Sequence, residues 1–435
     1  MSAPPANSLP RFDVAMLGAR RNYVVPRALA SVGMLETFYT DLYLGNKPFL
    51  RAFLGRLPRA AKPAGLRRFE GRFHGELPSS RVRSFDGFGI REVRQRNRTS
   101  TYSDLLQHFA DSGRTFCEAV IRDGSLAGCG IYASRGAALE LFEEARNRGM
   151  RRVVEQVGVP YRMYNELARV EGGLWPDWQP GLSDIPSRDP VSERERAEWR
   201  IADLVLVPSE FIENELIADG VDPRKIRVLP YSLEEERVVA TSTPRNADGE
   251  LHVLFVGSVS LMKGIQYLLY ALRLLNTAQI KCKIVGAQAI AAGCLHQFEP
   301  WATFVGPVPR REVEEYYRWA DVLVFPTICD SFGMVQLEAL EHGVPVIATV
   351  NAPAVVRDGI DGFVIPIRDS EAIAKRLHDL VESPGLRKAL RSEAQFRVQE
   401  FTLRSYSEKL TRQLTQLALG ADHESTPKCR RGIQN

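Results

Sequence analysis

Two carboxylates, Asp330 and Glu338, are the first candidates for chemistry because they flank the start of a predicted helix. The apolar run 322–325 predicts a buried strand, and a loop over 326–331 joins it to a helix from about Phe332. In open α/β sheets the carboxyl ends of the strands face the ligand crevice. Carboxylate oxygens accept paired hydrogen bonds from hydroxyl groups, so two of them in such a crevice suit a ribose and a hexose.

The same loop and helix start also suit an anion. Ser331 is a helix-capping residue type, and Gly333 lets the backbone approach a ligand closely. The free N–H groups of a first helical turn favour a diphosphate. The alternative reading of these residues alone is that Ser331 is only a cap and Glu338 a solvated helix side chain.

A third candidate for chemistry is Lys263. An apolar strand over 251–256 is followed by a turn that contains Gly257, and Lys263 then stands at the start of a predicted helix. A lysine in this place can meet a diphosphate and stabilise the negative charge that grows on it as it leaves. Taken by itself, Lys263 is equally an ordinary surface lysine.

The chain contains two series of alternating strands and helices, and these residues lie in the second. The first series has predicted strands over 12–17, 126–133, 152–157, 204–207 and 226–229, with helices over 26–32, 137–148 and 211–218. The second has strands over 251–256, 281–285, 303–305, 322–325, 345–349 and 363–365. Alternation of this kind predicts parallel sheets in an α/β protein.

Two domains are expected from a length of 435 residues. The stretch 234–249 is charged, has no strong apolar period and is typical of an interdomain linker. We therefore predict one Rossmann-like domain over 1–235 and a second over 236–400. Helical patterns fill 371–417, and the polar residues 420–435 are expected to form a disordered tail.

Composition excludes fibrous and wholly disordered classes, since 44% of the residues are hydrophobic and 25% are charged. The apolar runs are too short to span a bilayer, and the N-terminus lacks the features of a secretion signal. The six cysteines form no CxxC pair, which favours reduced packing residues over a zinc site. We therefore expect a cytoplasmic protein. A net charge of +4 does not indicate a nucleic-acid partner.

One segment, residues 47–72, has a charge pattern of its own. Its cations are interleaved with aromatic and aliphatic residues, and Glu70 is its only acid. The cations are Lys47, Arg51, Arg56, Arg59, Lys62, Arg67, Arg68 and Arg72. Such interleaving predicts contact with the inner face of a membrane or with a lipid-linked acceptor, and the alternative is a solvated basic face.

Four phrases of the sequence together resemble the family-4 (GT4) retaining glycosyltransferases of the GT-B superfamily. They are VPSEFIENELIADGVDPRKIRVLPYS (207–232), LHVLFVGSVSLMKGIQYLLYAL (251–272), FVGPVPRREVEEYYRWADVLVFPT (304–327) and DSFGMVQLEALEHGVPVIAT (330–349). The resemblance covers the C-terminal half and the end of the N-terminal half. It implies a GT-B fold, with two doubly wound Rossmann-like domains facing each other across a cleft and a helix over 401–419 returning to the first domain.

The resemblance also implies the chemistry. A sugar would pass with retained configuration from a UDP- or GDP-linked donor to a glycan, lipid-linked or small-molecule acceptor, without a metal or other cofactor. Carried over residue by residue, Asp330 would hold the donor sugar, Glu338 the ribose and Lys263 the diphosphate. The other residues carried over to the donor site are Gly257, Ser258, Val305, Ser331, Phe332, Gly333 and Met334, with the turn 305–308 bordering the base.

Three positions depart from the family's pattern. The first acid is usually Glu and is Asp330 here, one methylene shorter, and Ser258 stands where an Arg commonly follows the glycine. Paired glycines usually follow the first strand, whereas here Gly18, which we still expect at the donor site, is followed by Ala-Arg-Arg-Asn. Arg20, with Arg21, is a candidate to replace the missing Arg on the diphosphate or to bind an anionic acceptor. The alternative is that both are solvated loop charges.

The acceptor side gives weaker signals. Residues 132–134 and 155–156, at the ends of two predicted strands, are candidates to line an acceptor pocket, with a structural role for Tyr132 as the alternative. Two other functions stay open. A nucleotide-sugar-binding relative that has lost turnover would account for the three departures, and a nucleotide-sugar epimerase would need more acid or base side chains on the N-terminal side.

Overall fold

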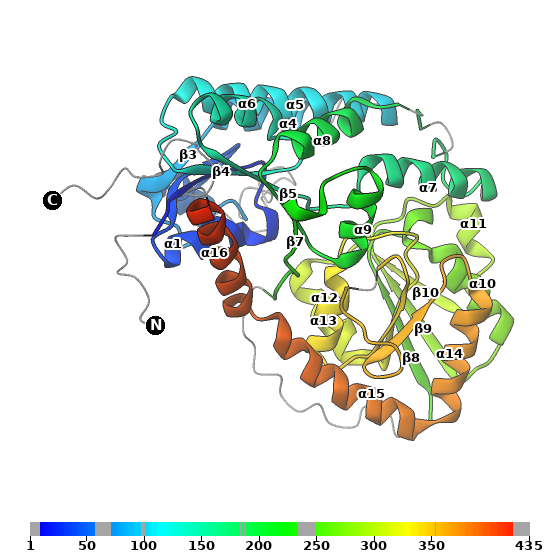
Figure 1. Ribbon diagram of the computed structural model, residues 1–435. Coiled ribbons are helices and arrows are strands. Elements are labelled where there is room, and N and C mark those ends of the chain that lie inside the picture. Colours follow the sequence, from blue (N-terminus) through cyan, green and yellow to red (C-terminus); the bar gives the residue numbers. More distant parts are fainter. Residues whose placement is uncertain are drawn as a thin grey trace.

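The computed structural model describes residues 9–56, 71–96, 101–182, 185–186, 188–233, 249–352 and 354–420. The predicted linker up to residue 248, the predicted tail beyond 420 and residues 57–70 of the basic segment lie outside these ranges. Two parallel sheets form two α/β domains (Figure 1). Hydrophobic cores lie on both faces of each sheet. The doubly wound fold class predicted from the sequence is confirmed.

The N-terminal sheet has seven parallel strands in the order β3-β2-β1-β4-β5-β6-β7. Their bounds are β1 Phe12–Met16, β2 Leu35–Thr40, β3 Val82–Ser84, β4 Gly130–Ser134, β5 Arg151–Glu155, β6 Leu204–Val207 and β7 Ile226–Val228. Side chains alternate along β1, so that Phe12 and Val14 enter one core and Ala15 the other. Helices cover both faces of the sheet, as the fully buried strands require.

Several helices of the N-terminal domain were not predicted from the sequence. They are η2 Arg20–Tyr23, α1 Val24–Ser31, α2 Pro48–Arg56, η4 Ser79–Arg81, α4 Asp86–Arg96, α5 Tyr102–Asp123, α6 Leu139–Asn147, α8 Pro190–Ile201, α9 Glu210–Ala218 and η5 Pro223–Lys225. Among the described helices α5 is the longest. It begins at a capping box of Thr101 and Asp104 and ends at Gly124, whose φ of 74° is left-handed. No described helix is long and apolar enough to cross a membrane.

The C-terminal sheet has six parallel strands in the order β10-β9-β8-β11-β12-β13. The strands are β8 Leu251–Val256, β9 Ile280–Val285, β10 Ala302–Gly306, β11 Val322–Phe325, β12 Val346–Thr349 and β13 Gly362–Ile365. The helices are η6 Leu261–Lys263, α10 Ile265–Leu275, α11 Ala292–His296, α12 Arg310–Trp319, α13 Met334–Glu341, α14 Ser370–Glu382, α15 Pro384–Arg397 and η7 Val398–Phe401.

One helix that precedes the linker in the sequence packs on the C-terminal domain. Helix α7, Tyr161–Leu174, follows β5, yet it belongs to the core under the C-terminal sheet. The buried carboxylate of Glu171 accepts hydrogen bonds from Gln266 Nε2 at 2.8 Å and Tyr267 Oη at 2.9 Å, and it pairs with Arg368. The sequence assigned all of 1–235 to the N-terminal domain, but α7 is part of the C-terminal core.

The last described helix follows the C-terminal domain in the sequence but packs on the N-terminal domain. Helix α16, Leu403–Leu419, runs beside α1 (Figure 1). Tyr406, Leu410 and Leu414 on its inner face are buried in the N-terminal core. Each domain is thus completed by a helix that lies on the other side of the linker in the sequence.

Candidate active site

The loops after β8 and β11 are held against each other by a glycine. Gly264 has a φ of 70°, and a Cβ atom there would lie 1.8 Å from the carbonyl oxygen of Pro326. Next to it, the amide of Ile328 donates to the carbonyl of Met262 at 2.9 Å. The short turn η6, which ends at Lys263, is therefore fixed on the residues that follow β11.

This contact brings Lys263 and Asp330 together. Nζ of Lys263 forms an ion pair with Oδ2 of Asp330, and it lies 5.3 Å from the ring centre of Phe325. Oδ1 of Asp330 accepts hydrogen bonds from the amides of Phe332 at 3.1 Å and Gly333 at 2.9 Å. The side chains of the ion pair stay 30% and 19% exposed, so a ligand can reach them.

The start of α13 differs from the prediction in its cap. Asp330 rather than Ser331 accepts from the amides before the helix, because an Asx turn at Asp330 already closes on both of them. The expectation that Ser331 caps the helix is wrong. Its hydroxyl donates to the carbonyl of Val157 at 3.4 Å, and its own carbonyl accepts from Ser209 Oγ at 2.7 Å. Ser331 therefore joins the two domains.

Two backbone amides remain free at this helix start. Those of Met334 and Val335 have no acceptor among the described residues. First-turn N–H groups lack partners within the helix and carry partial positive charge. The predicted backbone contacts are thus divided: the amides of Phe332 and Gly333 are taken by Asp330, and the two that follow are available to an anion.

Glu338 lies further along α13 and faces α12. Its Oε2 accepts a hydrogen bond from Tyr317 Oη at 2.8 Å, and its Oε1 is 3.9 Å from a guanidinium nitrogen of Arg310. Burial and the neighbouring Glu338 raise the pKa of Tyr317 well above its ordinary value, so the phenol stays protonated and donates. Tyr317 packs in the same core as Val305 and Val308. The positions that the resemblance implies for ribose and base therefore border the same hydrophobic core.

The turn after β8 leaves open space beside its glycine. Gly257 has a φ of 146°, and a Cβ atom there would meet nothing within 4 Å. Its carbonyl oxygen would instead be 1.7 Å from a Cβ at Gly286, which fixes the turn on the next strand. Ser258 is exposed. This turn offers a ligand backbone and a hydroxyl, and no cation at Ser258.

The loop after β1 presents Arg20, a cation with no ion-pair partner among the described residues. The amide of Gly18 donates to Oδ1 of Asp41 at 3.0 Å, and Asp41 pairs with Arg72 at 2.8 Å. Arg20 is exposed, and its Nε donates to the carbonyl of Leu17 at 3.2 Å. Arg20 forms no ion pair with any carboxylate in the described ranges. Arg20 is therefore available to an anion, whereas the Gly18 amide is already engaged.

Arg21 does not reach into open solvent beside Arg20. It forms a buried ion pair with Glu155, and its Nη2 donates to Tyr406 Oη at 3.0 Å. Its guanidinium carbon lies 3.9 Å from the ring centre of Tyr231. The hypothesis that Arg21 binds the diphosphate or an acceptor is therefore not supported. The sequence offered no signal for Tyr406, which is 385 positions away.

The residues suggested for the acceptor pocket are interior ones. Tyr132, Ser134, Glu155 and Gln156 are each at most 3% exposed. The side chain of Gln156 accepts a hydrogen bond from Trp199 Nε1 at 3.0 Å. The prediction that these side chains line an open pocket is wrong here, because they are used inside the N-terminal domain. The alternative, a structural role for Tyr132, fits its burial.

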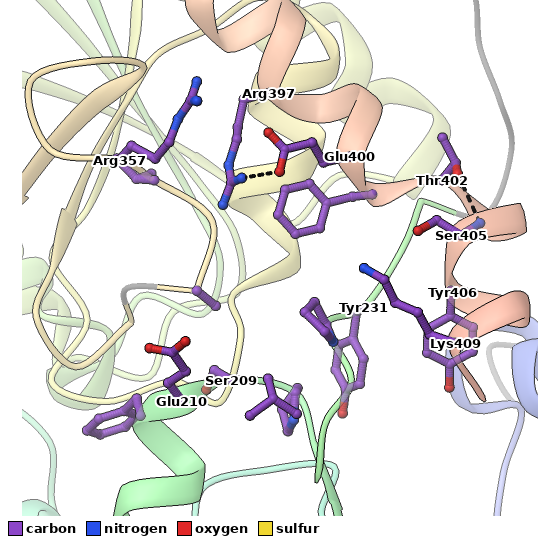
Figure 2. A pocket seen from close by; sticks show the side chains of 17 residues that line it. Ser209, Glu210, Tyr231, Arg357, Arg397, Glu400, Thr402, Ser405, Tyr406 and Lys409 are labelled. Carbon is purple, nitrogen blue, oxygen red and sulfur yellow. Dashed lines mark hydrogen bonds and ion pairs between the residues drawn. The ribbon is translucent and has the colours of Figure 1, made fainter. Parts of the chain in front are cut away.

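An interdomain cavity of about 420 Å³ lies beside the crossing of the chain (Figure 2). Polar side chains from both domains and from α16 line it: Ser209, Glu210, Tyr231, Arg357, Arg397, Glu400, Thr402, Ser405, Tyr406 and Lys409. Figure 2 shows Arg397 paired with Glu400 on the C-terminal side. None of the predicted donor-site residues lines this cavity, but Tyr231 and Tyr406, which contact Arg21, do.

Comparison of the sequence with known families and proteins also indicates similarity to glycosyltransferases. Residues 250–383 match the family described as "Glycosyl transferases group 1". A D-inositol 3-phosphate glycosyltransferase of Streptomyces bingchenggensis is 30% identical over 232 residues, 46% of this chain and 50% of that protein. One of Corynebacterium jeikeium is 31% identical over 258 residues, 53% of this chain and 61% of that protein. The matches span about half of the first relative and about 61% of the second.

Solved structures share both domains. Sucrose-phosphate synthase from Thermosynechococcus elongatus has a TM-score of 0.65 at 17% identity, covering 94% of this chain and 100% of that one. Anabaena Alr3699/HepE in complex with UDP-glucose has a TM-score of 0.58 at 15% identity, covering 93% and 100%. At such identities the likeness concerns the fold. Residues 250–383 thus resemble the group 1 glycosyltransferases, and the chain shares the two-domain fold of these solved glycosyltransferase structures.

Proposed function

We propose that this protein is a retaining glycosyltransferase that moves a sugar from a UDP- or GDP-sugar to a hydroxyl group of an acceptor. The observation that carries the proposal is the Lys263–Asp330 pair at the start of α13, beside the free amides of Met334 and Val335. One cation and two free N–H groups suit a diphosphate. Glu338 then accepts from the ribose hydroxyls, which carboxylates do well.

Lys263 has the central role in this mechanism. When the bond between the anomeric carbon and the diphosphate oxygen breaks, the electron pair stays on the diphosphate. The acceptor oxygen bonds to the anomeric carbon, and its proton passes to the departing diphosphate oxygen. Lys263 and the amides of α13 stabilise the charge that grows there, because they already point at the place where it develops. This arrangement carries the diphosphate charge with the chain's own groups.

Asp330 has two tasks in this proposal. Its Oδ1 is held by two amides, so the carboxylate is fixed and orients Lys263 through Oδ2. A carboxylate has about four lone-pair sites, and these contacts occupy three. The remaining site on Oδ2 can accept from a donor-sugar hydroxyl, which is the role that the resemblance implies. The shorter side chain of Asp, compared with Glu, places that hydroxyl closer to α13.

For the donor, we propose UDP first, because a similar fold has been solved with UDP-glucose. For the acceptor we propose a glycan, a lipid-linked sugar or a small polyol. Relatives named D-inositol 3-phosphate glycosyltransferase suggest an anionic polyol, and Arg20, which pairs with no carboxylate in the described ranges, suits an anionic group.

Turnover separates this proposal from its rivals. The protein is incubated with UDP-glucose, UDP-galactose, UDP-N-acetylglucosamine and GDP-mannose in turn, and release of UDP or GDP is measured. We expect slow hydrolysis of at least one donor, and hydrolysis slower by about 10²-fold or more in Lys263→Ala. A protein that binds UDP or GDP in calorimetry yet neither hydrolyses nor transfers any donor would favour the binding-only alternative. Interconversion of UDP-glucose and UDP-galactose without release of UDP would favour an epimerase.

We further propose that α2 contacts an anionic membrane surface on the cytoplasmic side. Phe49 is 91% exposed, and Arg51 and Arg56 on the same helix are exposed as well. Aromatic and cationic side chains together suit the headgroup region. By contrast, Lys47 and Arg72 pair with Asp86 and Asp41, so these two cations are neutralised within the fold.

Flotation with vesicles that contain phosphatidylserine tests this contact. The wild type should float, and a variant with Phe49, Arg51 and Arg56 changed to Ser should stay at the bottom of the gradient. A control with the exposed Arg224 changed to Ser should float like the wild type. Equal flotation of all three proteins, or of none, would rule the contact out.

A further inference from the structure

We propose that Arg21 is a positioning residue of the donor site, which fixes the start of α13 through Tyr231. Its backbone is unusual. Arg21, Asn22 and Tyr23 have φ values of 42°, 48° and 61°, three consecutive left-handed residues without a glycine. Such a conformation is unfavourable for each of them and persists only where the surroundings hold it. The contacts of the Arg21 side chain supply much of that support.

The guanidinium of Arg21 contacts three other parts of the chain at one point. It pairs with Glu155 at the carboxyl end of β5 and donates to Tyr406 of α16 at 3.0 Å. It also lies 3.9 Å from the ring centre of Tyr231, in the segment that leads from β7 to the second domain. The side chains of the ion pair are only 14% and 4% exposed. A charge pair this deeply buried holds its position, because either partner alone would be a buried, uncompensated charge.

From Tyr231 the contacts continue to the donor site. Its ring centre lies 5.1 Å from that of Phe332, which is 1% exposed. The amide of Phe332 donates to Asp330, and Asp330 pairs with Lys263. Each step is a packed or hydrogen-bonded contact, so a shift of the Arg21 guanidinium moves the carboxylate that orients Lys263. The hydroxyl of Tyr231 has no partner within the described ranges, so its ring makes the connection.

A second ion pair on the same strand provides the control. Arg152 in β5 pairs with Asp203; the arginine is about as shielded as Arg21, at 17% exposed, and the carboxylate is 18% exposed. This pair lies near the amino end of β5, whereas Glu155 ends the strand at the cleft side. Arg152→Lys therefore perturbs an ion pair of the same sheet without touching the path to α13. If Arg21 only stabilised the N-terminal domain, Arg21→Lys and Arg152→Lys would behave alike.

The first test needs no ligand. Hydrogen exchange of a peptide spanning Asp330 to Val335 is measured by mass spectrometry in the full-length protein. Arg21→Lys and Tyr231→Leu should each speed exchange there by about three- to thirtyfold. Tyr231→Phe, which keeps the ring, and Arg152→Lys should exchange like the wild type. Unchanged exchange in both Arg21→Lys and Tyr231→Leu, or an equal change in Arg152→Lys, would overturn the inference.

The second test depends on the proposed function and keeps the two ideas apart. In UDP calorimetry and donor turnover, Arg21→Lys and Tyr231→Leu should lower kcat about three- to thirtyfold, with less effect on KM, and their double variant should not be additive. Tyr231→Phe should restore the wild-type value. If exchange responds but the wild type binds neither UDP nor GDP, the positioning role stands and the proposed function falls. If the wild type turns over donor and the single variants match it, the positioning role falls.

Discussion

Lys263 and Asp330 reach each other from the loops that follow two neighbouring strands, β8 and β11, although they are 67 positions apart in the sequence. The order of the strands makes this contact, since parallel neighbours end at the same edge of the sheet. Gly264 then lets the two loops approach without a side chain between them. The pair is the point where the two predicted parts of the donor site meet.

Loss of Lys263 should affect the chemical step most. Lys263→Ala is expected to lower kcat by about 10²-fold or more, because it removes an electrostatic donor from the leaving group. The Kd for UDP should rise less, since the amides of α13 remain. Steady-state kinetics and calorimetry measure the two effects separately. A kcat within twofold of the wild type would contradict the assignment.

Two variants serve as matched comparisons for that prediction. Asp330→Asn keeps an oxygen over the amides of Phe332 and Gly333 but removes the charge that orients Lys263, so kcat should fall while the melting temperature changes little. Lys281→Ala removes a cation of β9 that is 51% exposed and pairs with Glu250, and its kinetics should match the wild type.

Glu338 should act mainly through donor binding. If it holds the ribose equally in the ground state and in the transition state, Glu338→Ala raises the KM for the donor about ten- to hundredfold and changes kcat little. Glu338→Gln can still accept from Tyr317 and should have a smaller effect. Kinetics with a donor series decide the matter. A variant that loses kcat at unchanged KM would instead place Glu338 at the reacting centre.

Gly264 should be intolerant of any side chain. Gly264→Ala puts a Cβ atom 1.8 Å from the carbonyl oxygen of Pro326 in a left-handed backbone, so the free energy of unfolding should fall by at least about 1–2 kcal/mol. Gly293→Ala, in α11, meets nothing within 4 Å and should be neutral or stabilise by about 0.5–1 kcal/mol. Urea titrations of both variants measure the difference, and similar values for the two would refute the steric argument.

Stability should depend on pH through Asp13 in β1. Burial raises the pKa of Asp13 from 3.8 to about 6, against the effect of the amides of Ala127 and Gly128, which donate to its Oδ2. The folded protein therefore binds a proton more tightly than the unfolded chain between these values. The contribution of Asp13 to the free energy of unfolding should be largest below pH 4. It should fall by about 3 kcal/mol as the pH rises past 6.

The Asp13→Asn variant isolates this contribution. It cannot ionise, yet its amide oxygen can still accept from the two backbone N–H groups. The difference between the unfolding free energies of wild type and variant should therefore change between pH 4 and pH 7 in the direction that favours the variant at the higher pH. A difference that stays constant over this range would show that Asp13 is ionised in the folded protein throughout.

The sequence predicted the strands best where they are buried on both faces. Strands β6, β8 and β11 have the predicted bounds, because a fully buried parallel strand is a continuous apolar run. Strand β4 begins four residues later than predicted. The amides of Ala127 and Gly128 donate to the Asp13 side chain, so this apolar stretch does not join the ladder. Strands β2 and β3 were missed because their sequences, LETFYT and VRS, lack such a run.

The donor site was predictable where its parts are local. Asp330 and the start of α13 share one short segment, and the family phrases name Lys263 and Glu338 by position. What could not be predicted depends on distant contacts. Nothing near Glu338 in the sequence indicates that Tyr317 will donate to it, and nothing near Arg21 indicates Tyr231 or Tyr406. A local rule also chose the wrong cap, since Ser331 and Asp330 are both capping types and only the turn geometry separates them.

The exchange of α7 and α16 between the domains bears on how the protein is made. Helix α16 supplies Tyr406, Leu410 and Leu414 to a core whose other members come from the first part of the chain. A ribosome that has finished the N-terminal sheet must therefore translate the whole donor domain before that core can close. Until then its apolar face beside α1 is open to chaperones and to other nascent chains. Cutting the gene at the linker would leave each half exposing the surface that its missing helix covers, so the two halves should accumulate only when they are produced together.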